Sequence, residues 1–439
     1  MERVAQLLDP GFAGYSYRSA LLRLWVLASN DQQLNHWEQE ANETTVAPHR
    51  AHFLERLQNE LPIQVEAIQA QPLALIRALD DYLASTRLPD TKTSVMTDEG
   101  KDFWLVPVQL EARRQAAMNR QPARLAKWFH HHAALPALTA HGIAVTVSEA
   151  RSSLHTALQR LANQPGEKLK VWIAHFDDGA DVVWDRQTSP IKNWRTQSVE
   201  PHDIRSESAI QTLSNAAKAG AQVVVFPEFS LDIQHREHVA AFLRQNTCSI
   251  QLVVAGAFHE SEPTGNMVAY NTAPVFTGSG SKLFAHRKLR LFGTAEFGAE
   301  FCELGNGLHV LITPIGCMTV LICKDFMDDH HTVNNLLAEV PVDWVWVPSY
   351  GNETTSKLNK DRAKKLADVT VGTSCGVAQT QNTAMKRPDE TQAQLPGFGH
   401  QAGEKTPRDV GVAGGLLEYG LAMQPKPQTS IPPALKRVK

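Results

Sequence analysis

The spacing of apolar residues divides the chain into two halves of different character. Up to about Gln164, apolar residues recur at every third or fourth position with charged residues between them, which is typical of amphipathic helices. Only residues 103–110 and 143–147 look strand-like, and Pro107 counts against the first because proline cannot donate to a sheet. The pattern predicts a mainly α-helical accessory domain over residues 1–165. Its predicted helices are residues 19–29, 52–59, 73–85, 110–120, 123–130 and 148–162.

Short apolar runs alternate with helical patterns after the turn signal at residues 164–166. Alternating strands and helices predict an α/β domain whose sheets are covered by helices. Residues 386–408 are rich in Gly, Pro and polar residues and are expected to form a loop, and residues 426–439 form a C-terminal tail. The predicted strands are residues 171–176, 222–226, 252–258, 267–276, 308–312, 318–323, 343–347 and 416–419. The predicted helices are residues 204–219, 233–245, 331–339 and 356–369.

The composition is that of an ordinary globular protein. Hydrophobic residues occupy 43% of the 439 positions and charged residues 20%, which provides apolar surface for a large core. The net charge of -3 gives no basic field of the kind that accompanies nucleic-acid binding by a whole chain. No run reaches the roughly 18 uncharged apolar residues of a membrane span, and the start of the chain lacks the apolar core of a signal peptide. We therefore expect a cytoplasmic protein with no membrane contact.

The cysteines and histidines give no metal-binding pattern. The five cysteines are an odd number without CxxC spacing, which argues against a disulfide framework and against a zinc site. Three consecutive histidines at positions 130–132 lie at the end of a helical pattern, where adjacent side chains point in different directions. We expect reduced thiols, a solvated helix end at the histidines, and no metal.

Three chain segments deliver a reactive side chain at the end of an apolar or strand-like run. Val-Val-Val-Phe-Pro leads to Glu228, Ala-His-Arg leads to Lys288, and Met-Thr-Val-Leu-Ile leads to Cys323. Each has a plainer interpretation: a solvated loop glutamate, a basic edge, and an inert core cysteine. Because its strand ends at the thiol, Cys323 is expected to be exposed. Strand ends that open into loops are where α/β folds usually place catalytic groups.

Taken together, these segments resemble the nitrilase superfamily of carbon-nitrogen hydrolases. Members carry a glutamate in a Phe-Pro-Glu context, then a lysine in a Tyr/His-Arg-Lys context, then a cysteine in an Ile-Cys-x-Asp/Glu context, and this chain has all three in that order. The likeness continues through the helix-turn-strand pattern of residues 216–228, the Val-Pro-Ser of residues 347–349, and residues 362–382. It implies a nitrilase-like α-β-β-α sandwich over residues 168–425.

The resemblance implies a catalytic triad of Glu228, Lys288 and Cys323. Glu228 accepts the thiol proton and later gives it to the leaving nitrogen. Lys288 and the backbone N–H of Lys324 stabilise the oxyanion, and the intermediate is a thioester on Cys323. No metal or organic cofactor is required. The family also implies a supporting glutamate after the lysine, for which Glu296 is the choice over the later Glu300 and Glu303.

The substrate and the partners stay open at this point. The triad is shared by enzymes acting on nitriles, amides and carbamoyl compounds and by acyl-transfer enzymes, so an amide-like small molecule is expected ahead of a nitrile. Tyr350 is a candidate for lining the substrate pocket, although a tyrosine after a strand is as often a packing residue. Family members commonly pair through the helices near the cysteine, so a homodimer or larger homo-oligomer is expected.

The helical half supports an alternative function. The chain is then a regulated effector or interaction subunit, in which the helical domain binds a protein or nucleic-acid partner and controls the hydrolase fold. A locally basic stretch favours this interpretation, whereas a solvated helix face explains the same charges. The basic residues are Arg113, Arg114, Arg120, Arg124 and Lys127.

Overall fold

The computed structural model describes residues 1–421 except for a set of gaps. The residues left out are 42, 87–94, 109–123, 151, 165, 188–191, 262–268, 295–297, 328–335, 370–372, 382–396 and 412–413. The predicted helix at 110–120 and most of the basic stretch therefore lie outside the described residues. Among the described helices, none is both long and apolar enough to traverse a lipid bilayer.

The first part of the chain is mainly helical, as predicted, but it also contains a small sheet. Strands β1, β2 and β3 form a three-stranded antiparallel sheet in that order. The strand predicted near residues 103–110 is β2, whereas the sequence did not predict β1 or β3. The helices are α1 (Glu2–Leu7), α2 (Tyr17–Ala28), α3 (Asp31–Glu40), α4 (Glu43–Gln58), α5 (Val65–Ala70), α6 (Pro72–Ser85), α8 (Arg124–Trp128) and α9 (Ser152–Asn163). The strands are β1 (Val95–Asp98), β2 (Lys101–Pro107), β3 (His132–Pro136) and β4 (Ala144–Glu149).

The consecutive histidines surround a buried carboxylate, so the prediction of a solvated helix end is wrong. Helix α8 ends before them and β3 begins at His132. The backbone N–H groups of His130 and His131 and the Nδ1 of His132 contact Asp80 of α6, which is 1% exposed. Burial raises the pKa of Asp80, but the hydrogen bond and charge of His132 and the charge of His131 lower it to about 2. Asp80 thereby ties α6 to the small sheet.

Two seven-stranded sheets form the α/β part. The first has the order β10-β11-β9-β8-β5-β21 with β12 paired to β11, and the second has the order β20-β19-β18-β17-β16-β15-β4. The first contains β5 (Lys168–Ile173), β8 (Val223–Val225), β9 (Leu252–Val254), β10 (Phe258–Ser261), β11 (Ala269–Thr277), β12 (Lys282–Arg287) and β21 (Gly415–Gly420). The second adds β15 (Gly307–Thr313), β16 (Gly316–Val320), β17 (Trp344–Gly351), β18 (Ser374–Gln381), β19 (Phe398–His400) and β20 (Arg408–Asp409) to β4.

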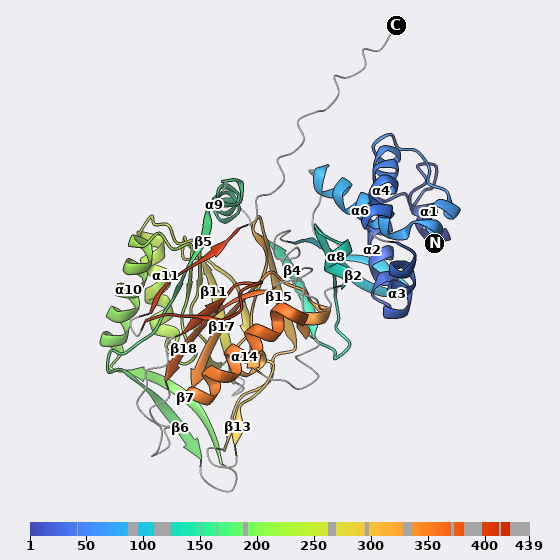
Figure 1. Cartoon of the computed structure of the whole chain (residues 1–439). Coiled ribbons are helices and arrows are strands. Elements are labelled where there is room, and N and C mark those ends of the chain that lie inside the picture. Colours follow the sequence, from blue (N-terminus) through green and yellow to red (C-terminus); the bar gives the residue numbers. More distant parts are fainter. Residues whose placement is uncertain are drawn as a thin grey trace.

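The two sheets pack face to face with helices on their outer faces (Figure 1). One apolar core joins Val171 and Val223 of the first sheet to Val320 and Trp346 of the second. Helices α10 (His202–Lys218) and α11 (Ile233–Gln245) cover the outer face of the first sheet. Helix α14 (Glu353–Val369) covers the second, where Leu366 shares a core with its strands. This α-β-β-α order confirms the predicted sandwich, and every predicted strand overlaps an observed one.

Short edge strands replace part of the loop expected at residues 386–408. Within the described residues of that range, β19 pairs with β18 and β20 pairs with β19. Strands of two and three residues are too short to give a periodic pattern in the sequence. The prediction of a loop was therefore wrong for these segments.

A separate four-stranded sheet was not predicted either. It has the order β13-β14-β7-β6 and consists of β6 (Asp181–Gln187), β7 (Asn193–Glu200), β13 (Gly293–Thr294) and β14 (Gly298–Glu300). Strand β14 runs parallel to β7, with Glu300 opposite Trp194. Strands β6 and β7 carry charged and polar residues on their exposed side, which hid them from a search for apolar runs.

Residues that precede the 164–166 turn in the sequence contact strands of the second sheet that follow it. Strand β4 precedes the turn but pairs in parallel with β15 over six residues, from Ala144 to Glu149. The Cys317 thiol of β16 donates to the carbonyl of Pro107 in β2 at 3.0 Å. One apolar cluster runs from the first helices through β2 and β3 to the outer face of the second sheet. The sandwich therefore includes a strand that comes before the turn.

Candidate active site

The three predicted catalytic side chains lie together inside the sandwich. Glu228 follows β8, Lys288 follows β12, and Cys323 lies between β16 and α12 (Lys324–Met327). The Lys288 Nζ donates to Glu228 Oε1 at 2.8 Å, and both charges act on the Cys323 thiol. Glu228 and Lys288 are each 1% exposed and Cys323 is 3% exposed. The cysteine is thus buried, contrary to the expectation of an exposed thiol, because α12 and β17 close over the end of its strand.

A second buried glutamate, Glu300, completes the environment of the lysine. The Lys288 Nζ lies 2.8 Å from Glu300 Oε2, so one ammonium group bridges two carboxylates. Asn271 of β11 also bridges them, because its Nδ2 donates to Glu228 at 2.9 Å and to Glu300 at 2.8 Å. Glu300 also accepts hydrogen bonds from the N–H of Phe292 at 2.9 Å, from Nε2 of His259 at 3.0 Å and from the thiol of Cys302 at 3.9 Å.

The tautomer of His259 follows from its contacts. The backbone N–H of Thr196 donates to Nδ1 at 2.8 Å, so Nδ1 carries a lone pair. Nε2 therefore carries the hydrogen that it donates to Glu300. Thr196 lies on β7, so the unpredicted four-stranded sheet fixes the orientation of a ring that supports Glu300, the partner of Lys288.

The two carboxylates differ strongly in acidity. Burial raises the pKa of Glu228, the positive charge of Lys288 opposes this, and the negative charge of Glu300 adds to it. Burial also acts on Glu300, but Lys288 and His259 hold its pKa well below the ordinary value. The two glutamates in turn raise the pKa of Lys288 well above its usual range, against the effect of burial. Glu300 is therefore a permanent anion that pairs with the ammonium, while Glu228 is able to exchange a proton.

Cys323 sits on a tight backbone turn at the start of a helix. Its φ of 43° is a left-handed conformation that non-glycine residues seldom adopt, and Phe229, beside Glu228, has a φ of 57°. The N–H of Cys323 donates to the Pro348 carbonyl at 2.8 Å, and its Sγ lies 3.6 Å from the Tyr350 carbonyl. Burial and the charge of Glu228 raise the pKa of Cys323 to about 12. The resting group is therefore a thiol that needs a base for activation.

Aromatic side chains form a wall beside the triad. The rings of Phe229 and Tyr350 are 5.4 Å apart, and Trp184 of β6 lies 5.6 and 5.7 Å from them. A bulge between Val183 and Trp184 interrupts the pairing of β6 with β7 there, and bulges commonly redirect a side chain. The hydroxyl of Tyr350 is buried and has no hydrogen-bond partner among the described residues. A ligand is a natural partner for such a group.

The remaining predicted supporting residues lie as follows. Glu296 is outside the described residues, and Glu300 is the acid that contacts Lys288. Glu303 is exposed whereas Glu300 is buried, and spacing by itself does not distinguish these two glutamates. Lys324 is the first residue of α12, and the first N–H groups of a helix have no partner within it.

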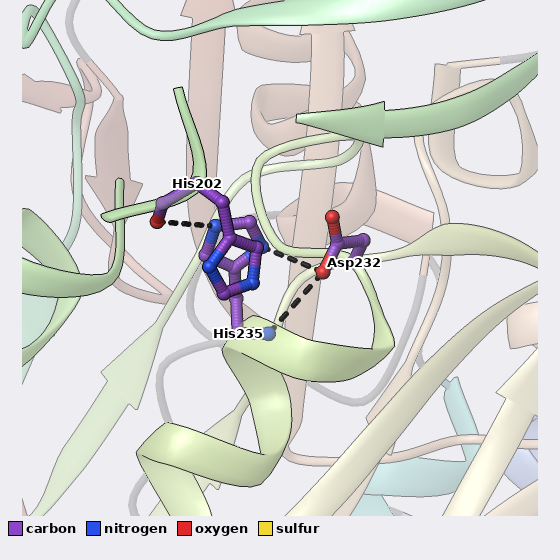
Figure 2. A group of neighbouring side chains, drawn as sticks. All are labelled: His202, Asp232 and His235. Atoms are coloured by element: carbon purple, nitrogen blue, oxygen red, sulfur yellow. Dashed lines mark hydrogen bonds and ion pairs between the residues drawn. The ribbon is translucent and has the colours of Figure 1, made fainter. Parts of the chain in front are cut away.

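A histidine-aspartate group elsewhere has the composition of a metal site but the geometry of a helix cap (Figure 2). Asp232 accepts from the N–H groups of Gln234 and His235 at the start of α11. The ring of His235 uses Nδ1 on Asp232 and Nε2 on the carbonyl of His202. The His202 and His235 rings stack at 4.0 Å and 30°, so their planes do not meet near a common ion. A second group, His259, Glu300 and Cys302, belongs to the hydrogen-bonded network of the lysine.

Comparison with known proteins finds a family model that matches the part of the chain that carries this site. Residues 189–337 match the sequence profile of the carbon-nitrogen hydrolases. Glu228, Lys288, Glu300 and Cys323 all lie within the matched residues. A search of the curated proteins finds no match.

Solved structures that include members of the nitrilase superfamily are similar to part of this chain. An amidase from Nesterenkonia sp. AN1 has 17% sequence identity and a TM-score of 0.39, with 58% of this chain and 91% of that chain covered. A Saccharomyces cerevisiae member of branch 10 of the superfamily has 17% identity and a TM-score of 0.40, with 62% and 96% covered. These alignments leave 38% and 42% of this chain uncovered.

Proposed function

We propose that this protein hydrolyses the carbon-nitrogen bond of a small amide-like substrate through a thioester on Cys323. One observation carries the proposal. The buried ammonium of Lys288 contacts two carboxylates beside a buried thiol, and the pKa of one carboxylate is raised while that of the other is lowered. One carboxylate keeps the ammonium charged, and the other is suited to proton transfer. The match of residues 189–337 to the carbon-nitrogen hydrolases supports this chemistry.

The first half-reaction forms the thioester and releases the nitrogen. Glu228 takes the thiol proton as Sγ of Cys323 attacks the carbonyl carbon. The negative charge that develops on the oxygen is stabilised by the Lys288 ammonium and the N–H of Lys324. Glu228 then returns the proton to the departing nitrogen, so that the carbon-nitrogen bond breaks and ammonia or an amine leaves.

The second half-reaction restores the enzyme. Water attacks the thioester carbonyl while Glu228 accepts one of its protons, and the carbon-sulfur bond breaks. The proton returns to the sulfur and a carboxylic acid leaves. Every step uses groups of this chain, and Glu228 serves as base and then as acid in each half-reaction.

The site disfavours an anionic acyl group. Glu300 and Lys288 balance one another's charge, and the wall beyond Cys323 includes Phe229, Tyr350 and Trp184. An anionic substituent placed against aromatic rings loses its hydration and meets the negative faces of the rings. A nitrile ranks lower because it needs an additional hydration step to reach the same acid.

The test is turnover of a panel of short amides, carbamoyl compounds and nitriles. We expect ammonia release from amides by the wild type, no release by Cys323→Ala, and a mass increase equal to the acyl group when the reaction is stopped early. Cys248→Ala, which changes a half-buried cysteine on another part of the fold, is the matched control and keeps full activity. Ammonia release that persists in Cys323→Ala contradicts the proposal.

We also propose that copies of the chain pair through the helices beside the cysteine. Helix α14 exposes 46% of Leu358. A cavity of about 320 Å³ lies between α12 and α14, lined by Met327, Leu358, Asp361, Arg362, Lys364 and Lys365. An apolar side chain beside a hollow of this kind suits a self-complementary interface. Light scattering is expected to give twice the chain mass for the wild type and less for Leu358→Glu, and a monomeric wild type rejects the pairing.

A further inference from the structure

Asp325, two residues after the nucleophile, makes an unusually complete set of contacts. It is 0% exposed. Its Oδ1 accepts from the backbone N–H groups of Leu289 at 3.0 Å and Arg290 at 2.8 Å. Its Oδ2 accepts from the N–H of Ile322 at 3.2 Å and lies 3.1 Å from Nε2 of His286. A carboxylate offers about four lone-pair positions, so these contacts use all of them.

These contacts join the two segments that carry the ammonium and the thiol. Leu289 and Arg290 follow Lys288 directly, and His286 precedes it by two residues on β12. Ile322 precedes Cys323. We propose that Asp325 is a positioning residue that fixes the ammonium of Lys288 relative to the thiol of Cys323, a role that rests on the proposed function.

Because all four lone-pair positions of Asp325 are occupied, we assign it a positioning role and not a catalytic one. A carboxylate whose lone pairs are all engaged has none left for substrate, water or proton transfer. It acts by holding backbone in place, and the backbone here needs holding because Cys323 has a φ of 43°. Such conformations persist only where the surroundings over-determine them. A displacement of about 1 Å between reacting groups costs about 100-fold in rate.

We call the four donors to Asp325 and their acceptor the clamp. His286 is the one side chain among these donors, and the other three are backbone N–H groups. An ionised carboxylate only accepts hydrogen bonds, so Nε2 of His286 donates to Asp325. Nδ1 is buried and has no partner among the described residues. The ring thus uses one nitrogen to tie β12 to α12, and it makes no described contact with Glu228 or Cys323. His286→Phe removes one donor of the clamp and leaves the three backbone donors.

Asp325→Asn is the variant that divides the clamp. The amide oxygen still accepts from Leu289 and Arg290, but the NH₂ group meets the N–H of Ile322, which is also a donor. The half of the clamp that holds the cysteine is therefore lost. Asp343→Asn is the matched control. Asp343 is 0% exposed and accepts from the N–H of Cys317 at 2.7 Å, at the opposite end of β16 from Cys323.

The experiment measures the alkylation rate of Cys323 by iodoacetamide, with the modified mass as readout, together with kcat, KM and thermal unfolding. We expect Asp325→Asn to slow alkylation at least ~10-fold and kcat ~100-fold, with KM nearly unchanged. Asp325→Glu restores part of both rates, and His286→Phe has a smaller effect. Asp343→Asn lowers the unfolding temperature with alkylation and kcat unchanged.

Two results overturn the proposal. One is alkylation by Asp325→Asn at the wild-type rate, and the other is an equal loss of rate in Asp343→Asn. Alkylation of Cys323 does not require turnover. The positioning role of Asp325 and the proposed hydrolase function can therefore be rejected independently of each other. A wild type that turns over no amide but alkylates faster than Asp325→Asn contradicts the hydrolase function alone.

Discussion

At the residue scale, the proposed chemistry depends on two glutamates that share one lysine. Glu300 accepts hydrogen bonds from His259, Asn271 and the Phe292 N–H as well as from Lys288, whereas Glu228 accepts from Lys288 and Asn271. The anion with more hydrogen-bond donors keeps its charge, and its negative field makes the second carboxylate easier to protonate. This asymmetry gives each acid a different task.

The pH dependence of the reaction follows from that asymmetry. Burial and the Glu300 anion hold the pKa of Glu228 above 4.5, and Glu228 must be ionised to take the thiol proton. The value of kcat/KM therefore falls as the pH drops through a pKa above 4.5. Glu300→Gln removes the neighbouring negative charge, so this acidic limb moves to lower pH while kcat falls ~100-fold or more. The exposed Glu303→Gln is the control, and an acidic limb unmoved in Glu300→Gln contradicts the assignment.

Two tyrosines offer a matched test of the substrate wall. The Tyr350 hydroxyl is buried without a partner among the described residues, whereas the Tyr419 hydroxyl donates to the Cys375 carbonyl at 2.8 Å. Tyr419→Phe is expected to lower the free energy of unfolding by about 1 kcal/mol, because it removes a made hydrogen bond. Tyr350→Phe is expected to leave stability unchanged or higher and to raise KM. A loss of stability with unchanged KM in Tyr350→Phe refutes the substrate contact.

At the scale of elements, the sequence revealed what is apolar and regular. Strands such as β8 and β16 are uninterrupted apolar runs, so their ends, and with them Glu228 and Cys323, were predictable. Strands β6 and β7 could not be predicted in this way, because their outer side is polar and their pairing is bulged at Trp184. Glu300 escaped for a related reason: its role depends on the pairing of β14 with β7, which brings together residues about a hundred positions apart in the chain.

The tie between α6 and β3 provides a prediction about stability. Asp80 has a pKa of about 2 in the folded protein, compared with an ordinary 3.8, which corresponds to about 2 kcal/mol. Because the folded pKa is depressed, this stabilisation is present above the unfolded pKa and is lost as the pH falls through the folded one. Asp80→Asn is expected to lower the free energy of unfolding by about this amount at neutral pH. Asp81→Asn, which changes a partly exposed ion pair with Arg50, costs less.

Chemical denaturation of both variants at neutral pH and near pH 3 measures this difference. The difference in free energy of unfolding between wild type and Asp80→Asn is expected to narrow as the pH falls from neutral toward 2. A difference that stays constant over this range means that the variant changes packing and not charge.

At the scale of the whole molecule, the helical part is joined to the sandwich by structure and not only by chain connection. Strand β4 extends the second sheet, the Trp104 indole N–H of β2 donates to the Val145 carbonyl at 3.1 Å, and Cys317 contacts Pro107. The apolar cluster that contains Val106 continues into the outer face of the sheet that carries Cys323. We therefore expect damage to this junction to reach β16, the strand that precedes Cys323.

A substitution at the junction tests this continuity. Val106 is 0% exposed on β2, so Val106→Asp buries a charge without a partner and is expected to cost several kcal/mol. Because β2 and β16 are in contact, tryptophan fluorescence and Cys323 alkylation are expected to report unfolding at the same, lower denaturant concentration. Val183→Asp, at a 36% exposed site on β6, leaves the midpoint nearly unchanged. If fluorescence shifts in Val106→Asp while the protection of Cys323 stays at the wild-type midpoint, the helical part unfolds independently of the hydrolase and the shared core has no energetic consequence for the site.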